Sequence, residues 1–175
     1  MNYQIDRFEK DIPVSVLLEK YFDYETTLDC CRNCSCFAST WSCPEFDFDV
    51  RDYWESFQTY HIIVDRVSNE GTSSQEEAES RLLREKTRYD SEMLALEAAG
   101  PGRKALYAQE CELCARCARL SGLPCVQPEK MRYALEALGM LAVDIVREEL
   151  GIELKWSDGI SIPDYYLLVG GYLIP

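Results

Sequence analysis

The chain has 175 residues, of which 47% are hydrophobic and 28% are charged, a composition typical of a soluble globular protein. Its formal net charge of −13 disfavours nucleic acid and anionic membrane surfaces as partners, because phosphate binding needs a concentrated positive surface. The sequence shows no bilayer-spanning apolar stretch, and its charged N-terminus lacks the apolar core of a signal peptide. We therefore expect a single cytoplasmic domain over residues 1–175, in which thiols stay reduced.

The first part of the chain predicts short helices, one loop and one strand. Residues 10–24 predict a short helix that begins after Pro13. The segment "CCRNCSCFASTWSCPEF", residues 30–46, has no sustained period and contains Ser, Asn and Pro, which indicates a loop. After it, "VRDYWESF" predicts one or two helical turns. The β-branched run "YHIIVDRV", residues 60–67, predicts a strand.

A long helix follows this strand. It is predicted to start at Ser73, whose spacing to Glu76 is that of a capping box, and "AAGPG" stops it. The basic run "RLLREKTR" within it is predicted to form intrahelical ion pairs rather than a phosphate site. The next segment, "RKALYAQ", predicts a second strand that leads directly into a group of cysteines.

The last part of the chain predicts a second long helix and a final strand. The helix covers about residues 129–150, with Pro128 suited to its start and Gly151 to its end. The apolar segment "DYYLLVGGYLIP" predicts a strand in which Gly170–Gly171 marks a bulge or a close backbone approach. Together the elements predict an α+β fold: a small, mainly antiparallel sheet, two long helices and two cysteine-rich metal-binding loops.

Most of the nine cysteines fall into two groups. The first contains Cys31-x2-Cys34-x8-Cys43, and the second is Cys111-x2-Cys114-x2-Cys117-x7-Cys125. In a reducing compartment, clustered cysteines are typical of metal or redox sites, and an odd count fits disulfide pairing poorly. A Cys-x2-Cys loop lets two thiolates converge on one metal, as in zinc and iron–sulfur sites. The spacing therefore indicates all-thiolate metal binding.

The second group favours a [4Fe–4S] cluster over zinc. Three cysteines separated by two residues each can hold three corners of a cubane, with a fourth ligand from further along the chain. Zinc more often takes two Cys-x2-Cys pairs, or a pair with histidines. The single histidine, His61, lies in a strand pattern and is predicted to be a core or edge residue rather than a ligand. One cluster, two clusters and a shared zinc ion all remain compatible with the spacing.

The two groups resemble a prokaryotic family of predicted metal-binding proteins of unknown function. The resemblance rests on "CRNC…FASTWSCP" and on "CELCARCARLSGLPCVQPEKMRYALEALG", and it extends to the end of the second predicted helix. Phe37 and Ala38 stand where that family has Tyr-Gly, and Cys30 and Cys36 fall outside its motif. The resemblance implies the following metal ligands: Cys31, Cys34, Cys43, Cys111, Cys114, Cys117 and Cys125.

Three functions follow as hypotheses. The favoured one is an iron–sulfur protein, with one or two [4Fe–4S] clusters, that serves electron transfer or redox support of a partner enzyme. The second is an enzyme with an under-ligated cluster, for which Tyr133, Glu136 and Asp144 are candidate lining residues; the alternative for them is a packed aromatic ring and solvated carboxylates. The third is a zinc-binding structural or interaction domain.

Overall fold

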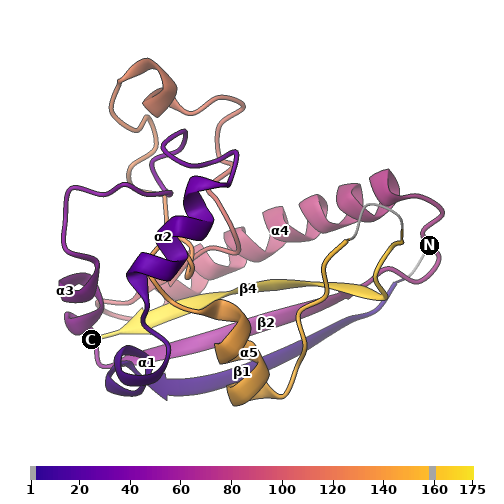
Figure 1. The fold of residues 1–175 in the computed structure, drawn as a ribbon, viewed down its shortest axis with the longest axis horizontal. Helices are drawn as coiled ribbons and strands as arrows, with labels where there is room; N and C mark the ends of the chain where they lie inside the picture. The colour runs from indigo at the N-terminus through magenta and orange to yellow at the C-terminus, as the bar shows by residue number, and fades with distance from the viewer. Residues whose placement is uncertain (1–2, 158–160) are drawn as a thin grey trace.

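The computed structural model describes residues 3–157 and 161–175 and has an α+β fold, as predicted (Figure 1). Within the described residues the strands form a four-stranded sheet in the order β1-β2-β4-β3, and all neighbouring strands are antiparallel. The strands are β1 (Ile5–Pro13), β2 (Thr59–Ser68), β3 (Lys104–Leu106) and β4 (Tyr165–Ile174). The three strands predicted from the sequence are thus confirmed as β2, β3 and β4.

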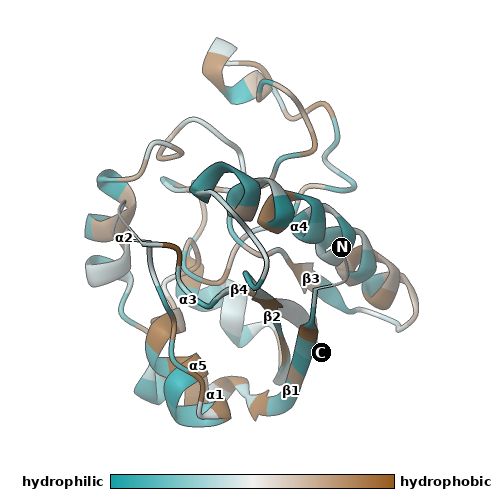
Figure 2. Ribbon diagram, turned by 90° about the vertical axis from the view of Figure 1, so that its right-hand side faces the viewer, coloured by the Kyte–Doolittle hydropathy of each residue, from teal (hydrophilic) through white to brown (hydrophobic). Residues whose placement is uncertain are grey.

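Helices pack on both faces of the sheet (Figure 2). The long helix α4 (Gln75–Ala98) covers one face, and the shorter α1 (Val14–Lys20), α3 (Val50–Glu55) and α5 (Ala142–Leu150) cover the other. Side chains alternate along a strand, so β2 contributes to both cores. Ile62 and Val64 join the core with α1, α3 and α5, whereas Ile63 joins the core with Tyr89 of α4.

A buried carboxylate fixes α4 to the sheet. Asp65 on β2 is buried and accepts hydrogen bonds from Arg7 Nε at 2.6 Å and from Arg88 Nη2 at 2.5 Å. Burial alone would raise the pKa of Asp65, but the two guanidinium groups outweigh it and lower that pKa. The charge of Asp65 is therefore compensated by one residue from β1 and one from α4.

The N-terminal prediction was partly wrong. The helix expected to begin after Pro13 does begin at Val14, but it ends at Lys20, and a second helix, α2 (Tyr24–Arg32), follows α1 after a short break. The residues before α1 form β1, which pairs with β2 from Ile5 opposite Val67 to Pro13 opposite Thr59. β1 is an edge strand, so the missing N–H of Pro13 is tolerated at its end.

The second long helix was also predicted wrongly. Residues 129–141 form turns and irregular segments with isolated β-bridges at Ala134 and Met140, and only Ala142–Leu150 are helical, ending at Gly151 as expected. Gly139 has a φ of +85°, which breaks a helix, and the carbonyl oxygen of Leu138 accepts a 2.8 Å hydrogen bond from the indole of Trp54. Leu138 is still fully buried, so the apolar stripe that suggested a helix packs in an irregular segment.

The first long helix and the short helix α3 are confirmed, with one change at the start of α4. The N-cap is Ser74 rather than Ser73: its Oγ accepts a hydrogen bond from Glu77 N at 3.2 Å. The carboxylate of Glu77 accepts a 2.9 Å bond from Ser73 N. In the described part of the chain, no helix combines the length and the apolar character needed to cross a membrane.

Gly170 provides a test of the packing between β4 and α4. A Cβ atom at this position would lie 2.6 Å from the carbonyl oxygen of Leu106 and 3.0 Å from the hydroxyl of Tyr89, as the predicted close approach requires. We predict that Gly170→Ala lowers the free energy of unfolding in urea by about 2 to 3 kcal/mol, because the methyl group overpacks a backbone contact. Gly71→Ala, where no atom lies within 4 Å, should cost only its left-handed backbone strain, about 1 kcal/mol. Equal losses would contradict this packing.

Candidate metal centre

The predicted cysteine ligands lie on two loops that project together from one side of the sheet (Figure 1). The first loop follows α2, which carries Cys31 on its last turns. The second loop follows β3 and contains the short 3-10 helix Ala118–Ser121. Direct hydrogen bonds join the loops: among them, Cys111 N donates to Ser42 Oγ at 2.9 Å, and the Trp41 indole donates to Leu123 O at 3.1 Å. The fold thus brings the two cysteine groups side by side.

Arg119 is the strongest link between the loops. Its Nη1 donates to the carbonyl oxygens of Thr40 at 2.7 Å and Cys43 at 2.5 Å, and its Nη2 donates to that of Glu45 at 2.9 Å. The guanidinium also lies 5.2 Å from the centre of the Trp41 ring. Backbone carbonyls in an irregular loop need donors, and a charged donor makes stronger bonds than a neutral one. One side chain from the second loop therefore fixes the course of the first.

The structure gathers the whole second group around one small cavity. Cys111, Cys114, Cys117 and Cys125 all line it, together with Met131 and other residues from both loops. Gln127 Nε2 lies 3.4 Å from Cys114 Sγ and donates a hydrogen bond to it. Burial raises the pKa of the Cys111 thiol, and the nearby ammonium group of Lys86 opposes that rise.

The first group forms a looser arrangement. Cys34 N donates to Cys31 O at 2.9 Å in the turn after α2, and Cys36 N donates to Cys34 Sγ at 3.4 Å. Burial raises the pKa of Cys31 to about 11, and the negative charges of Cys43 and Cys34 contribute to the rise. Burial also raises the pKa of Cys43. These three thiols therefore lie within electrostatic range of one another.

The two cysteines outside the family motif have different surroundings. Cys30 is exposed on α2. Cys36 is half-buried, and burial followed by the charge of Glu110 raises its pKa to about 12. Cys36 is thus closer in character to the predicted ligands than Cys30 is.

Coordination itself is not visible in the described residues. Within residues 3–157 and 161–175, no three Cys, His, Asp or Glu side chains gather closely enough to hold one ion. The seven-cysteine ligand set stays a prediction, in which four thiols line one cavity, Cys31 lies on α2, and Cys34 and Cys43 lie in the loop after it. The donor set fits soft or borderline metals, because thiolate ligands select zinc and iron–sulfur clusters. His61 instead bonds Asp11 at 2.6 Å and stacks on Tyr172.

Lys86 was not recognised as a site residue from the sequence. The basic run that contains it predicts intrahelical ion pairs, and Lys86 does bond Asp90 at 2.8 Å on the same helix. However, Lys86 is buried, and its Nζ also donates to the carbonyl oxygen of Glu110 at 2.8 Å, immediately before Cys111. Asp90 in turn accepts the N–H of Ala108. Helix α4 therefore anchors the root of the second loop, a contact that charge patterning alone does not reveal.

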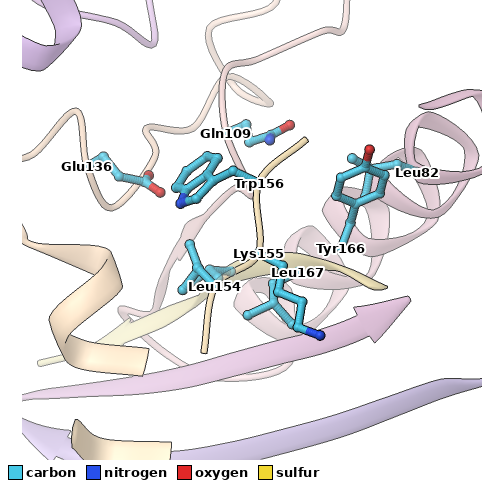
Figure 3. A pocket seen from close by; sticks show the side chains of 9 residues that line it. Leu82, Gln109, Glu136, Leu154, Lys155, Trp156, Tyr166 and Leu167 are labelled. Atoms are coloured by element: carbon cyan, nitrogen blue, oxygen red, sulfur yellow. The ribbon is translucent and has the colours of Figure 1, made fainter. Parts of the chain in front are cut away.

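The three candidates for an open-site enzyme have separate locations. Tyr133 packs against the rings of Phe46, Phe48 and Tyr53, and Asp144 pairs with Arg147 on α5. Glu136 lines a pocket of about 70 Å³ with Gln109 and Trp156 among its other lining residues (Figure 3). Burial raises the pKa of Glu136, and its charge contributes to the raised pKa of Cys31. Tyr133 is thus a packed aromatic ring and Asp144 is an ion-paired carboxylate, so both fit the alternative to a role at an open cluster. Glu136, in contrast, faces a pocket.

These features define a cysteine-rich candidate metal centre built from two loops on an α+β scaffold. The sequence profile of the family described as "Predicted metal-binding protein (DUF2284)" matches residues 19–174. The chain therefore belongs to this family, which confirms the resemblance of its cysteine motifs. No curated protein and no solved structure matches the chain.

Ala38 provides a first test of the loop geometry. It has a φ of +53°, where the family motif has glycine, and its N–H donates to Pro44 O at 2.9 Å across the loop. An alanine in this left-handed conformation is strained, so we predict that Ala38→Gly raises the free energy of unfolding by about 0.5 to 1 kcal/mol. Ala95→Gly, at an exposed position within α4, should lower it by about 1 kcal/mol. A loss of stability in both variants would contradict the loop conformation.

Arg119 provides the second test. We predict that Arg119→Met accelerates amide hydrogen exchange in residues 38–46 by about tenfold or more, because several charged hydrogen bonds to that loop are lost. The control is Arg116→Met, which removes the same charge from an exposed position three residues earlier. Exchange at β2 and β4 amides should stay unchanged in both variants. Equal acceleration by the two substitutions would show that charge, and not the contact of Arg119, holds the loops together.

Proposed function

We propose that the protein carries [4Fe–4S] clusters on its two cysteine groups and passes electrons to a partner protein. The observation that carries this proposal is that Cys111, Cys114, Cys117 and Cys125 all line one cavity. Three thiols with the Cys-x2-Cys-x2-Cys spacing, and a fourth from Cys125, suit a cubane better than a zinc ion. Because the chain belongs to a predicted metal-binding family, metal binding is supported, and the choice of iron is our inference.

Each group would hold its own cluster in this proposal. The second group would supply four thiolates, and Cys31, Cys34 and Cys43 would supply three to the first. A bound cluster provides one-electron chemistry, and the surrounding protein tunes its potential through hydrogen bonds to sulfur and through nearby charge. Gln127, which donates to Cys114 Sγ, and the backbone N–H of Cys36, which donates to Cys34 Sγ, are suited to that role.

The surface around the second loop supports docking of a redox partner. Leu120, Leu123 and Val126 are 53%, 58% and 68% exposed, and they flank the cysteines of this loop. Large apolar side chains left exposed along one loop favour an interaction site. The net charge of −13 favours a partner with a basic docking surface. Electrons would then leave through the second loop, which projects from the body of the protein.

A second candidate function is an enzyme that acts at the first cysteine group. Three predicted ligands would leave one position of a cubane open for substrate. Glu136 favours this candidate because its carboxyl group faces a pocket and lies within electrostatic range of Cys31. The two functions differ in whether a small molecule binds at the first group.

Serine variants of single cysteines test the proposal. In protein isolated without oxygen, we predict that Cys114→Ser and Cys34→Ser each remove roughly half of the bound iron, and that the double variant removes nearly all of it. Cys30→Ser is the matched control, because this thiol is exposed and outside the motif, and its iron content should equal that of the unaltered chain. Complete loss of iron from either single variant would indicate one shared centre, and unchanged iron in both would refute the ligand assignment.

A further inference from the structure

A groove lined by aromatic rings lies beside the second cysteine group. It encloses about 400 Å³, which is within the range of small-molecule sites. Its lining residues come from both loops and from the segment before α5, and they are Trp41, Glu45, Phe46, Asp47, Phe48, Pro124, Cys125, Met131 and Tyr133. Trp41, Cys125 and Met131 also line the cavity of the second cysteine group. A ligand in the groove would therefore contact a predicted metal ligand directly.

Three of the rings form one wall of the groove. Phe46 and Phe48 stack with ring centres 5.0 Å apart, and Tyr133 meets Phe46 edge-on, also at 5.0 Å. Trp41, Phe46, Phe48 and Tyr133 are only partly buried, so aromatic surface remains open to a ligand. The face of an aromatic ring carries negative electrostatic potential, which attracts cations that have little hydration to lose.

The charged side chains that line the groove are negative, like the electrostatic potential over the ring faces. Glu45 and Asp47 line it and are exposed, and no lysine or arginine occurs among the described residues that line it. The charge of Asp47 contributes to the raised pKa of Tyr133, which is consistent with a position close to this ring. Arg119 lies near Trp41, but its guanidinium is engaged with backbone carbonyls of the first loop. The groove is thus apolar in its wall and negative at its rim.

We propose that this groove binds a weakly hydrated organic cation, such as a methylated ammonium group, next to Cys125. An anion would be repelled by Glu45 and Asp47. A small inorganic cation would need several oxygen ligands to replace its water shell, and the aromatic wall does not supply them. A methylated ammonium group gains both contact with the rings and attraction to the two carboxylates. This inference does not depend on which metal the cysteines hold.

Choline and its neutral isostere 3,3-dimethylbutan-1-ol test the proposal, because they share their shape and differ in charge. With the full chain as purified, calorimetric titration should show saturable binding of choline that is about tenfold tighter than binding of the alcohol. Equal affinities would overturn the proposal and leave a merely apolar groove. The absence of saturable choline binding would overturn it as well.

Matched variants locate the binding. Asp47→Asn should weaken choline binding several-fold and leave the alcohol unaffected, because it removes one charge and keeps the side-chain shape. Glu70→Gln, the same change at an exposed carboxylate after β2, should alter neither. Trp41→Leu should reduce choline binding about tenfold or more through the loss of the ring. If Asp47→Asn and Glu70→Gln had the same effect, the cation would bind elsewhere and the proposal would fail.

Discussion

The arrangement of the cysteine loops depends on the guanidinium group of Arg119. The first loop has turn hydrogen bonds of its own, and several of its carbonyl groups also accept from one charged donor on the second loop. Irregular backbone near a cysteine-rich site has to satisfy its polar groups without a sheet or a helix. A single arginine adds to the turn hydrogen bonds in doing so here, and it also lies against Trp41 at the boundary between the cysteine cavity and the aromatic groove.

Regular secondary structure anchors the start of each cysteine loop to the body of the protein. Helix α2 delivers Cys31 on its last turns, and Lys86 of α4 holds the backbone just before Cys111. Lys86 and Asp90 form a buried ion pair, and an ion pair alone seldom offsets the cost of burying two charges. Here each side chain also hydrogen-bonds to the backbone, Lys86 to Glu110 and Asp90 to Ala108, which offsets more of that cost. The sheet beneath, anchored to α4 through Asp65, therefore acts as the rigid base from which two less regular loops project.

Part of this structure could be predicted from the sequence. The β-branched and apolar runs of β2 and β4 indicate strands by themselves, and the cysteine spacing indicates thiolate metal binding. β1 was missed because its residues carry many charges, and its conformation comes from pairing with β2 rather than from local preference. The stripe around Leu138 has helical spacing, yet the left-handed Gly139 and the Trp54 indole hold it in turns. Arg119 and Lys86 act through backbone atoms far along the chain, which no residue pattern discloses.

The most direct test of the account is the content of iron, acid-labile sulfide and zinc in the chain purified without oxygen. Two bound [4Fe–4S] clusters predict iron and sulfide in equal amounts, about eight of each per chain, with a broad visible absorbance that fades on reduction. Stoichiometric zinc without sulfide, in protein that also takes up no cluster when supplied with iron and sulfide, would contradict the account and leave a structural zinc site on the same loops.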